Sequence, residues 1–329
     1  MALNYMKLIS IRTILFWGTI CVILIWGVIL SLALTDRSFQ LFIPSIPTFA
    51  WFKTEPALQI DLPKDGPWRQ DLFMGSGDLS NFGGKSFLVH GSATPSAIFK
   101  NSDIVVYFNY YPATNRKAFG LINWIKSSDL GRKWTTPSPI YISSLPELST
   151  NPISPQAVVL PSGKIKLYFI AKKLNQERNT LMAAISNDGV NFVFDPTTSF
   201  EIEDESLISF SLTILQDRMH LIAFTKEGQS SNMSYNAISY DTKVFTRLAD
   251  IKIADTFYGQ TSLVSDGKEL KLLGASPKGL WSSISANGNT WSDPSYYNLS
   301  VQNPNTVYVG EKYLLFYTAD TNPQNTPAE

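Results

Sequence analysis

The chain has 329 residues, of which 16% are charged and 44% hydrophobic, and its formal net charge at pH 7 is zero. Lysine and arginine are scattered and form no basic run interleaved with aromatic residues, which excludes a nucleic-acid-binding surface. The single cysteine, Cys21, lies in an apolar N-terminal segment, so the remainder of the chain has no disulfide, no thiolate metal site and no cysteine nucleophile.

The first predicted element is a membrane-spanning helix over residues 13–35. This segment contains no charged residue, and a helix of its length spans a hydrocarbon core of about 30 Å. Lys7 and Arg12 precede the segment and Asp36 follows it. This charge order predicts a cytoplasmic N-terminus over residues 1–12 and a body on the other side of the membrane.

A cleaved signal peptide is the alternative interpretation of the same segment. Ser31 and Ala33 are small residues of the kind that precede a cleavage site. The apolar run is longer than the usual core of a signal peptide, which is about 7–15 residues. We therefore expect an uncleaved signal anchor and a single-pass membrane protein.

Residues 36–66 are predicted to form a stalk. Prolines recur at Pro44, Pro47, Pro56 and Pro63, and proline interrupts both helices and sheets. We expect a semi-extended segment whose aromatic residues lie at the membrane interface. Packing of this segment along the side of the following domain is the alternative.

Five units of similar length follow residue 90. Each opens with a short apolar strand and turns tightly into a second strand, and the first four units add a third and a fourth strand. The fifth unit has only two strands before the chain ends, so we expect residues 66–90 to supply the others and close a ring. The expected fold is all-β, a five-bladed β-propeller over residues 67–320, with a disordered tail over residues 321–329.

A turn signature lies between the third and fourth strands of the first four units. Its clearest copy is SSDLGRKW at residues 127–134, and looser copies are SNDGVNF at 186–192, SYDTKVF at 239–245 and SANGNTW at 285–291. In such a turn an Asp or Asn accepts from backbone amides, a Gly takes a positive φ, and the aromatic ring packs on the sheet. The spacing suits one copy per blade. We therefore expect structural roles for Asp129, Asp188, Asp241 and Asn287.

This signature resembles the Asp-box repeat of sialidases and related propellers. The second unit, PQAVVLPSGKIKLYF at residues 155–169 followed by TLMAAISNDGVNF at 180–192, resembles the repeat of five-bladed glycoside hydrolases of the arabinanase, fructosidase and mannoside-phosphorylase type. The resemblance covers residues 90–320. It implies the propeller fold, and it implies recognition or hydrolysis of carbohydrate without a cofactor.

Blade topology places the signature turns on one face and the loops between blades on the other, where propellers of this type have their sites. Hydrolysis of a glycosidic bond needs two carboxyl groups. Glu205 and Asp255 come just before the first strands of units three and four, and they are the expected acid and base. Other residues of this face are expected to bind substrate: His90, Thr94, Tyr110, Tyr111, Arg116, Arg178 and Tyr258.

Two departures from these families argue against an enzyme. The resembling hydrolases carry Asp before the Pro that opens the first unit, whereas this chain has Thr94, with Ser154 and Ser209 in later units. A hydroxyl group cannot act as the general base. Sialidases need three arginines around a carboxylate, and only Arg116 and Arg178 are placed securely on the expected face. The alternative function is a non-catalytic propeller that binds a glycan or a partner protein at the membrane.

The body of the chain has no further motif that indicates a cofactor. His220 lies in a predicted second strand and is expected to be a core histidine. No spacing of His, Cys and carboxylate residues is typical of a metal site. The expected partners are therefore a carbohydrate and the membrane, with a protein partner as the alternative.

Overall fold

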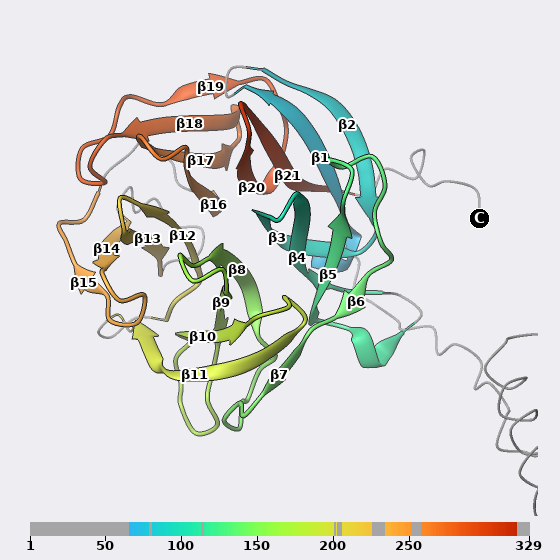
Figure 1. The fold of residues 1–329 in the computed structure, drawn as a ribbon, viewed down its shortest axis with the longest axis vertical. Helices are drawn as coiled ribbons and strands as arrows, with labels where there is room; N and C mark the ends of the chain where they lie inside the picture. Colours follow the sequence, from blue (N-terminus) through green and yellow to red (C-terminus); the bar gives the residue numbers. More distant parts are fainter. Residues whose placement is uncertain are drawn as a thin grey trace, which may run out of the picture. The chain divides into compact units, whose positions relative to one another are not determined.

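Five sheets surround a common axis in the computed structural model, which confirms the predicted all-β five-bladed propeller (Figure 1). The structure describes residues 66–78, 81–112, 115–200, 202, 206–225, 234–251 and 258–320. Within these ranges no helix is long and apolar enough to span a membrane. The predicted helix over residues 13–35, residues 36–65 of the predicted stalk and the predicted tail over 321–329 lie outside the described residues.

The strands of each blade follow one another outwards from the axis of the ring. Blade one contains β3 (Ser92–Lys100), β4 (Asp103–Tyr110), β5 (Leu121–Ser127) and β6 (Ser138–Pro139). Blade two contains β8 (Ile153–Val159), β9 (Ile165–Ala171), β10 (Thr180–Ser186), β11 (Asn191–Phe200) and an added parallel strand, β7 (Tyr141–Ser143). Blade three contains β12 (Ser209–Leu215), β13 (Arg218–Phe224), β14 (Tyr235–Ser239) and β15 (Thr246–Arg247). Blade four contains β16 (Tyr258–Ser265), β17 (Leu270–Ser276), β18 (Gly279–Ser285) and β19 (Ser295–Tyr297).

Blade five joins the two ends of the propeller, as the strand deficit of the fifth unit predicts. Its inner strands are β20 (Gln302–Val309) and β21 (Lys312–Asp320), and its outer strands are β1 (Gln70–Asp78) and β2 (Asn81–Val89). β1 pairs antiparallel with β21 along a continuous register. The ring is therefore closed by backbone hydrogen bonds between segments far apart in the sequence (Figure 1).

The hydrophobic core lies between the blades. Five clusters of buried apolar side chains each draw residues from two neighbouring blades, and together they complete the circle. Tyr107, Tyr168 and Phe316 are among the largest fully buried side chains and belong to three different clusters. A single blade has both faces apolar, so it depends on its two neighbours to remove those faces from water.

The signature turns share one hydrogen-bond pattern. In the first, Ser127 Oγ donates to Asp129 Oδ1 at 2.8 Å, and that oxygen accepts from the amides of Arg132 at 3.0 Å and Lys133 at 2.9 Å. In blade four the amide oxygen of Asn287 accepts from two backbone amides in the same way. The turn therefore needs an acceptor oxygen at this position, which Asp and Asn both supply.

Three of the turns are also hydrogen-bonded to the preceding blade. Tyr107 donates its hydroxyl to Gly189 O at 2.9 Å, and Tyr168 donates to Thr242 O at 2.7 Å. Asn236 Nδ2 donates to Gly288 O at 3.0 Å. These bonds tie the turns of blades two, three and four to blades one, two and three. The turns thus lock neighbouring blades together on one face of the ring.

Candidate binding site

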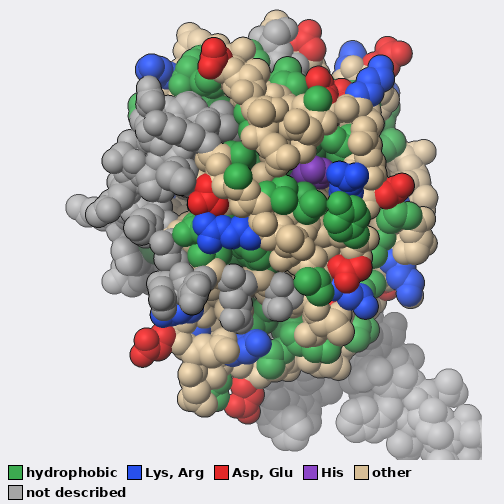
Figure 2. Space-filling model, turned by 90° about the vertical axis from the view of Figure 1, so that its left-hand side faces the viewer, with side chains coloured by type: hydrophobic (Ala, Val, Ile, Leu, Met, Phe, Trp, Pro, Cys, Tyr) green, Lys and Arg blue, Asp and Glu red, His purple; other side chains and the backbone are tan. Residues whose placement is uncertain are grey.

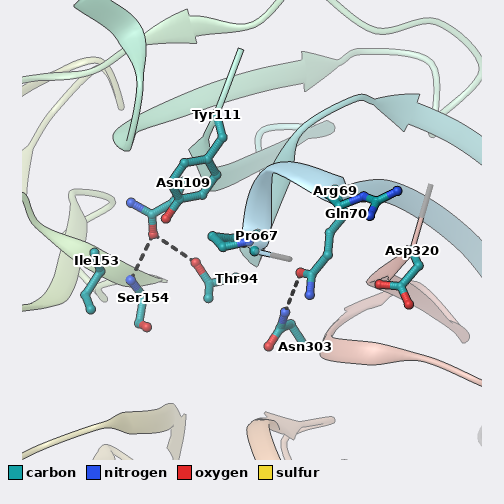
Figure 3. Close-up of a pocket in the computed structure, with 12 residues that line it drawn as sticks. Pro67, Arg69, Gln70, Thr94, Asn109, Tyr111, Ile153, Ser154, Asn303 and Asp320 are labelled. Carbon is teal, nitrogen blue, oxygen red and sulfur yellow. Dashed lines mark hydrogen bonds between the residues drawn. The ribbon is translucent and has the colours of Figure 1, made fainter. Parts of the chain in front are cut away.

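A pocket of about 750 Å³ opens on the face opposite the signature turns, at the inner ends of blades five, one and two. The two ends of β4 show which face this is. The first residues of β4 pair with the end of β5 that leads into the blade-one turn, whereas Asn109 and Tyr110 lie at the opposite end of β4. Figure 3 shows side chains from the three blades converging on the pocket. The lining residues are Gly66, Pro67, Arg69, Gln70, Ala93, Thr94, Asn109, Tyr111, Ile153, Ser154, Asn303 and Asp320.

Three lining residues occupy the same irregular position on their inner strands. Thr94, Ser154 and Asn303 each precede a proline and have φ values of 52°, 52° and 47°. Each lies in a register shift of β3, β8 or β20 against the second strand of its blade. A bulge redirects the side chain out of the strand's normal alternation, and proline cannot donate a ladder hydrogen bond there. The X-Pro bulge therefore turns these three side chains to the pocket.

Asn109 holds two of these residues in place. Its Oδ1 accepts from Thr94 Oγ1 at 2.9 Å and from the Ser154 amide at 3.0 Å (Figure 3). Its Nδ2 donates to Gly120 O at 3.2 Å and to Pro152 O at 3.0 Å. The side chain is buried, and both its donor and its acceptor atoms have partners. Asn109 therefore links the bulges of blades one and two.

The opposite wall joins Gln70 of β1 to residues of β20 and β21, and ring closure brings Gln70 to them. Asn303 Nδ2 donates to Gln70 Oε1 at 3.1 Å and to Thr318 Oγ1 at 3.0 Å (Figure 3 shows the first bond). Gln70 Nε2 donates to Gln302 Oε1, and Gln302 Nε2 donates to Asp320 Oδ1 at 3.4 Å. This wall is a hydrogen-bonded layer of amide and hydroxyl groups that ends in one carboxylate.

An aromatic side chain borders the pocket on the blade-one side. Tyr111 follows β4, and its amide donates to Gly91 O at 2.6 Å. Its ring packs edge-on against Phe119, with centroids 5.1 Å apart. Burial raises the pKa of the Tyr111 hydroxyl above its ordinary value, so the group is a neutral hydrogen-bond donor at physiological pH.

The structure brings together only part of the predicted site. Thr94 and Tyr111 line the pocket, whereas Tyr110, His90 and Arg178 do not. Tyr110 packs into the cluster between blades five and one, because side chains alternate along β4. His90 Nδ1 lies 3.0 Å from Asp71 Oδ1, and its ring packs on Phe87.

The remaining predicted residues are described in part or not at all. Arg178 is an exposed residue of the loop after β9. The backbone of Arg116 lies in a short 3-10 helix, η3 (Arg116–Ala118), and Tyr258 begins β16. Glu205 and Asp255, the predicted acid and base, lie outside the described residues. The catalytic pair therefore stays a prediction.

The pocket residues that sequence reasoning missed include all three of its side-chain amides. Asn303 had a local signal, because Asn303-Pro304 repeats the arrangement of Thr94-Pro95 and Ser154-Pro155 in another unit. Asn109 and Gln70 had none, since an amide in or next to a strand is common and their partners lie in other blades.

The electrostatics of the described residues are mixed. Figure 2 shows acidic and basic side chains interspersed with neutral ones on the side that it presents. In the described ranges no group of His, Cys, Asp and Glu residues is arranged to hold a metal ion.

His220 is buried beneath the blade-four turn, and burial lowers the pKa of its imidazole. A Cβ atom at Gly288 would stand 2.7 Å from its Nδ1, which explains the glycine in that turn.

No family model and no curated protein matches the sequence, but solved structures match the fold. The structure of a family 117 glycoside hydrolase from Zobellia galactanivorans aligns over 80% of this chain and over 96% of its own chain, with TM-score 0.53 and 13% sequence identity. The GH43 enzyme from Xanthomonas citri, complexed with xylose, matches 72% and 89%, with TM-score 0.51 and 11% identity. The exo-β-1,3-galactanase from Phanerochaete chrysosporium, with galactose, matches 75% and 64%, with TM-score 0.53 and 12% identity. The chain shares the propeller fold of these glycoside hydrolases.

Proposed function

We propose that the pocket binds a carbohydrate. Its walls present hydroxyl and amide groups from Thr94, Ser154, Asn303 and Gln70, beside the ring of Tyr111. Neutral donors and acceptors around an aromatic ring match the hydroxyl groups and apolar faces of a sugar. The structural neighbours complexed with xylose and with galactose share the fold, and this supports the same class of ligand here.

The residues at the inner-strand bulges favour recognition over hydrolysis, and this observation carries the proposal. Thr94, Ser154 and Asn303 occupy the bulge position of three blades, and Gly259 lies in the corresponding register shift of β16. None of the four can ionise as an acid or a base. Among the described lining residues Asp320 is the single carboxylate, whereas glycosidic hydrolysis needs two.

Hydrolysis by Glu205 and Asp255 is the second candidate function. Both residues precede inner strands, β12 and β16, whose first residues lie on the pocket face. Turnover of a glycoside that is lost in both Glu205→Gln and Asp255→Asn would establish this candidate. Unchanged turnover in both variants would remove it.

Glycan-array binding by the full-length protein in detergent tests the recognition proposal. We expect binding to a defined set of glycans, with affinity reduced about tenfold or more in Thr94→Val, which keeps the side-chain shape and removes the hydroxyl. Thr136→Val is the matched control, because Thr136 is exposed and lies next to the blade-one turn, on the other face. Absence of glycan binding, together with capture of a protein through the same pocket residues, would favour the partner-protein alternative.

We propose further that residues 13–35 anchor the propeller to a membrane, with residues 1–12 in the cytoplasm. The support is the uncharged segment and its flanking charges. The full-length protein should remain in the membrane pellet after alkaline extraction, and a variant lacking residues 1–35 should not. A mature N-terminus just after Ala33 would show instead that the segment is a cleaved signal peptide.

The four turns support a further assignment, to the Asp-box repeats of sialidases. In each turn the Ser donates to the Asp or Asn in the same way, and an aromatic residue follows six or seven residues after the Ser. Replacing the four acceptor residues should then affect folding and leave ligand specificity unchanged.

A further inference from the structure

Around the axis, side chains join four of the five neighbouring pairs of inner strands. The Ala97 amide of β3 donates to Asn305 Oδ1 of β20, and the Ala157 amide of β8 donates to Ser96 Oγ of β3, both at 2.8 Å. The Thr306 amide of β20 donates to Ser262 Oγ of β16 at 2.8 Å. Ser211 of β12 and Thr261 of β16 share a hydrogen bond of 3.1 Å. We call each junction between two inner strands a seam.

The fifth seam, between β8 and β12, has no hydrogen bond between its described residues. Equivalent registers place Gln156 of β8 where blade one has Ser96, and they place Leu212 of β12 where blade two has Ala157. By this pattern Gln156 should accept from the Leu212 amide. Gln156 instead extends across the axis to Asn305, whose Nδ2 donates to its Oε1 at 3.4 Å. We call the β8–β12 seam open, because its described residues lack the hydrogen bond expected between Gln156 and the Leu212 amide.

The orientation of the Gln156 amide follows from its neighbour. Asn305 Oδ1 already accepts from the Ala97 amide, so the Asn305 amide group directs its Nδ2 donor towards Gln156. The Gln156 atom that accepts this bond is therefore Oε1. Gln156 Nε2 is thereby directed away from Asn305. Gln156 is 3% exposed, and its Nε2 has no partner among the described residues. A buried donor without an acceptor is costly, so this atom indicates a missing partner.

We propose that the open β8–β12 seam holds one ordered water, which accepts hydrogen bonds from Gln156 Nε2 and from the Leu212 amide. Both protein groups are uncharged donors, so the occupant must be an acceptor, and a water oxygen meets this requirement. Having accepted two bonds, the water has two hydrogens left to donate. Gln156 lies two residues beyond the pocket-lining Ser154 on β8. We therefore place the water beneath the blade-two side of the pocket, where it can donate to an oxygen of the ligand.

The role in recognition rests on the proposed carbohydrate function, whereas the water itself does not. Gln156→Met in the full-length protein removes the donor and keeps the length of the side chain. We expect its melting temperature to fall by about 2–4 °C or more, because a satisfied buried hydrogen bond is lost. A melting temperature equal to or above that of the wild type would mean that Nε2 has no partner, and it would overturn the proposal.

Thr306→Val is the matched control. Thr306 Oγ1 is also buried without a partner among the described residues, but it lies at a seam that the Thr306 amide already closes. Removing this hydroxyl should leave the melting temperature unchanged or raise it. Because Gln156→Met also deprives Asn305 of its acceptor, a high-resolution crystal structure of the wild type provides the deciding measurement. Density for a water within hydrogen-bond distance of Gln156 Nε2 is expected, and an empty seam would refute the proposal.

Affinity separates the water from its role in recognition. For a glycan bound by the wild type, Gln156→Met should lower the affinity about tenfold and Thr306→Val should leave it unchanged. Equal affinities would remove the water from ligand recognition. If the wild type binds no glycan, the carbohydrate proposal fails, while the melting temperatures and the crystal density still decide whether the water is present.

Discussion

Asp188 illustrates how one side chain organises a turn. Its Oδ1 accepts from the amides of Val190 and Asn191 and from Ser186 Oγ, each at 2.8 Å. The Asn191 side chain, followed by these backbone amides, holds the pKa of the Asp188 carboxyl well below its ordinary value. Asn287 makes the equivalent bonds in blade four without a charge. Both residues therefore meet the same requirement, which is a side-chain oxygen placed to accept from the backbone amides of the turn.

Substitution at Asp188 separates geometry from charge. Asp188→Ala removes the acceptor and should lower the free energy of unfolding by about 1 kcal/mol or more at pH 7. Asp188→Asn keeps an acceptor oxygen and should lose less. Urea unfolding at pH 7 measures both, with the exposed Asp293→Asn as control. Equal losses in the two Asp188 variants would show that the charge, and not the acceptor geometry, stabilises the turn.

The same carboxyl makes the stability depend on pH. Because its pKa is lower in the folded protein, its contribution is fully present above the ordinary carboxyl pKa, and it is lost as the pH falls towards the folded value. The wild type should therefore lose more stability than Asp188→Asn between pH 5 and pH 3, by urea unfolding. Parallel pH profiles for the two proteins would contradict this prediction.

At the scale of the element, Lys166 of β9 connects blades two and three. Its side chain is 0% exposed, and Nζ donates to Asp195 Oδ2 at 2.9 Å, Thr198 Oγ1 at 2.7 Å and Thr242 O at 2.8 Å. Asp195 and Thr198 belong to β11, and Thr242 lies in the blade-three turn. Burial lowers the pKa of Lys166, and the ion pair with Asp195 opposes that shift. Lys166 and Asp195 thus form a hydrogen-bonded ion pair that is buried between blades two and three.

Breaking this pair should cost more than removing it. Lys166→Met leaves the buried Asp195 unpaired, and the free energy of unfolding should fall by about 3–5 kcal/mol. The double variant Lys166→Met with Asp195→Leu should lose clearly less, because no buried charge remains. Urea unfolding of the wild type, both single variants and the double variant gives the coupling.

A more exposed pair provides the control for this cycle. Lys126 lies 3.1 Å from Asp103, and their side chains are 37% and 29% exposed. Lys126→Met should cost about 0–1 kcal/mol, since water screens the charges. If Lys166→Met cost no more than Lys126→Met, the buried pair would have no special role in joining the blades.

At the scale of the whole molecule, stability depends on the closure of blade five. β21 pairs with β1 on one side and β20 on the other, so it holds both ends of the propeller. It also carries Phe316, which packs against Trp134 of the blade-one turn with ring centroids 5.9 Å apart. Loss of β21 would expose the apolar faces of blades one and four together.

Truncation tests this dependence. A chain that ends at Val309 lacks β21 and should lose its cooperative thermal unfolding transition, because two hydrophobic clusters lose one of their walls. A chain that ends at Asp320 keeps every described strand and should melt like the full-length protein. Circular dichroism melting of both truncated chains decides the prediction, and a cooperative transition in the shorter one would show that closure is dispensable.

The sequence by itself determined the fold to the level of the blade. A blade is a run of neighbouring strands joined by short turns, so its apolar strands and its turn signature lie within about 45–60 consecutive residues and are readable locally. The two-strand deficit of the fifth unit was sufficient to predict closure by residues 66–90. The parallel strand β7 was not predicted, because its pairing with β11 joins the linker before blade two to that blade's outer edge.

The pocket was decided only by the tertiary structure. Asn109 meets Ser154 across two blades, and Gln70 meets Asn303 and Thr318 across the closed ring. Such contacts link residues whose separation in the sequence carries no pattern, so a local signal cannot predict them. Strand alternation and bulges also decide which neighbour faces the pocket, and this is why Tyr111 lines it while Tyr110 is packed between blades.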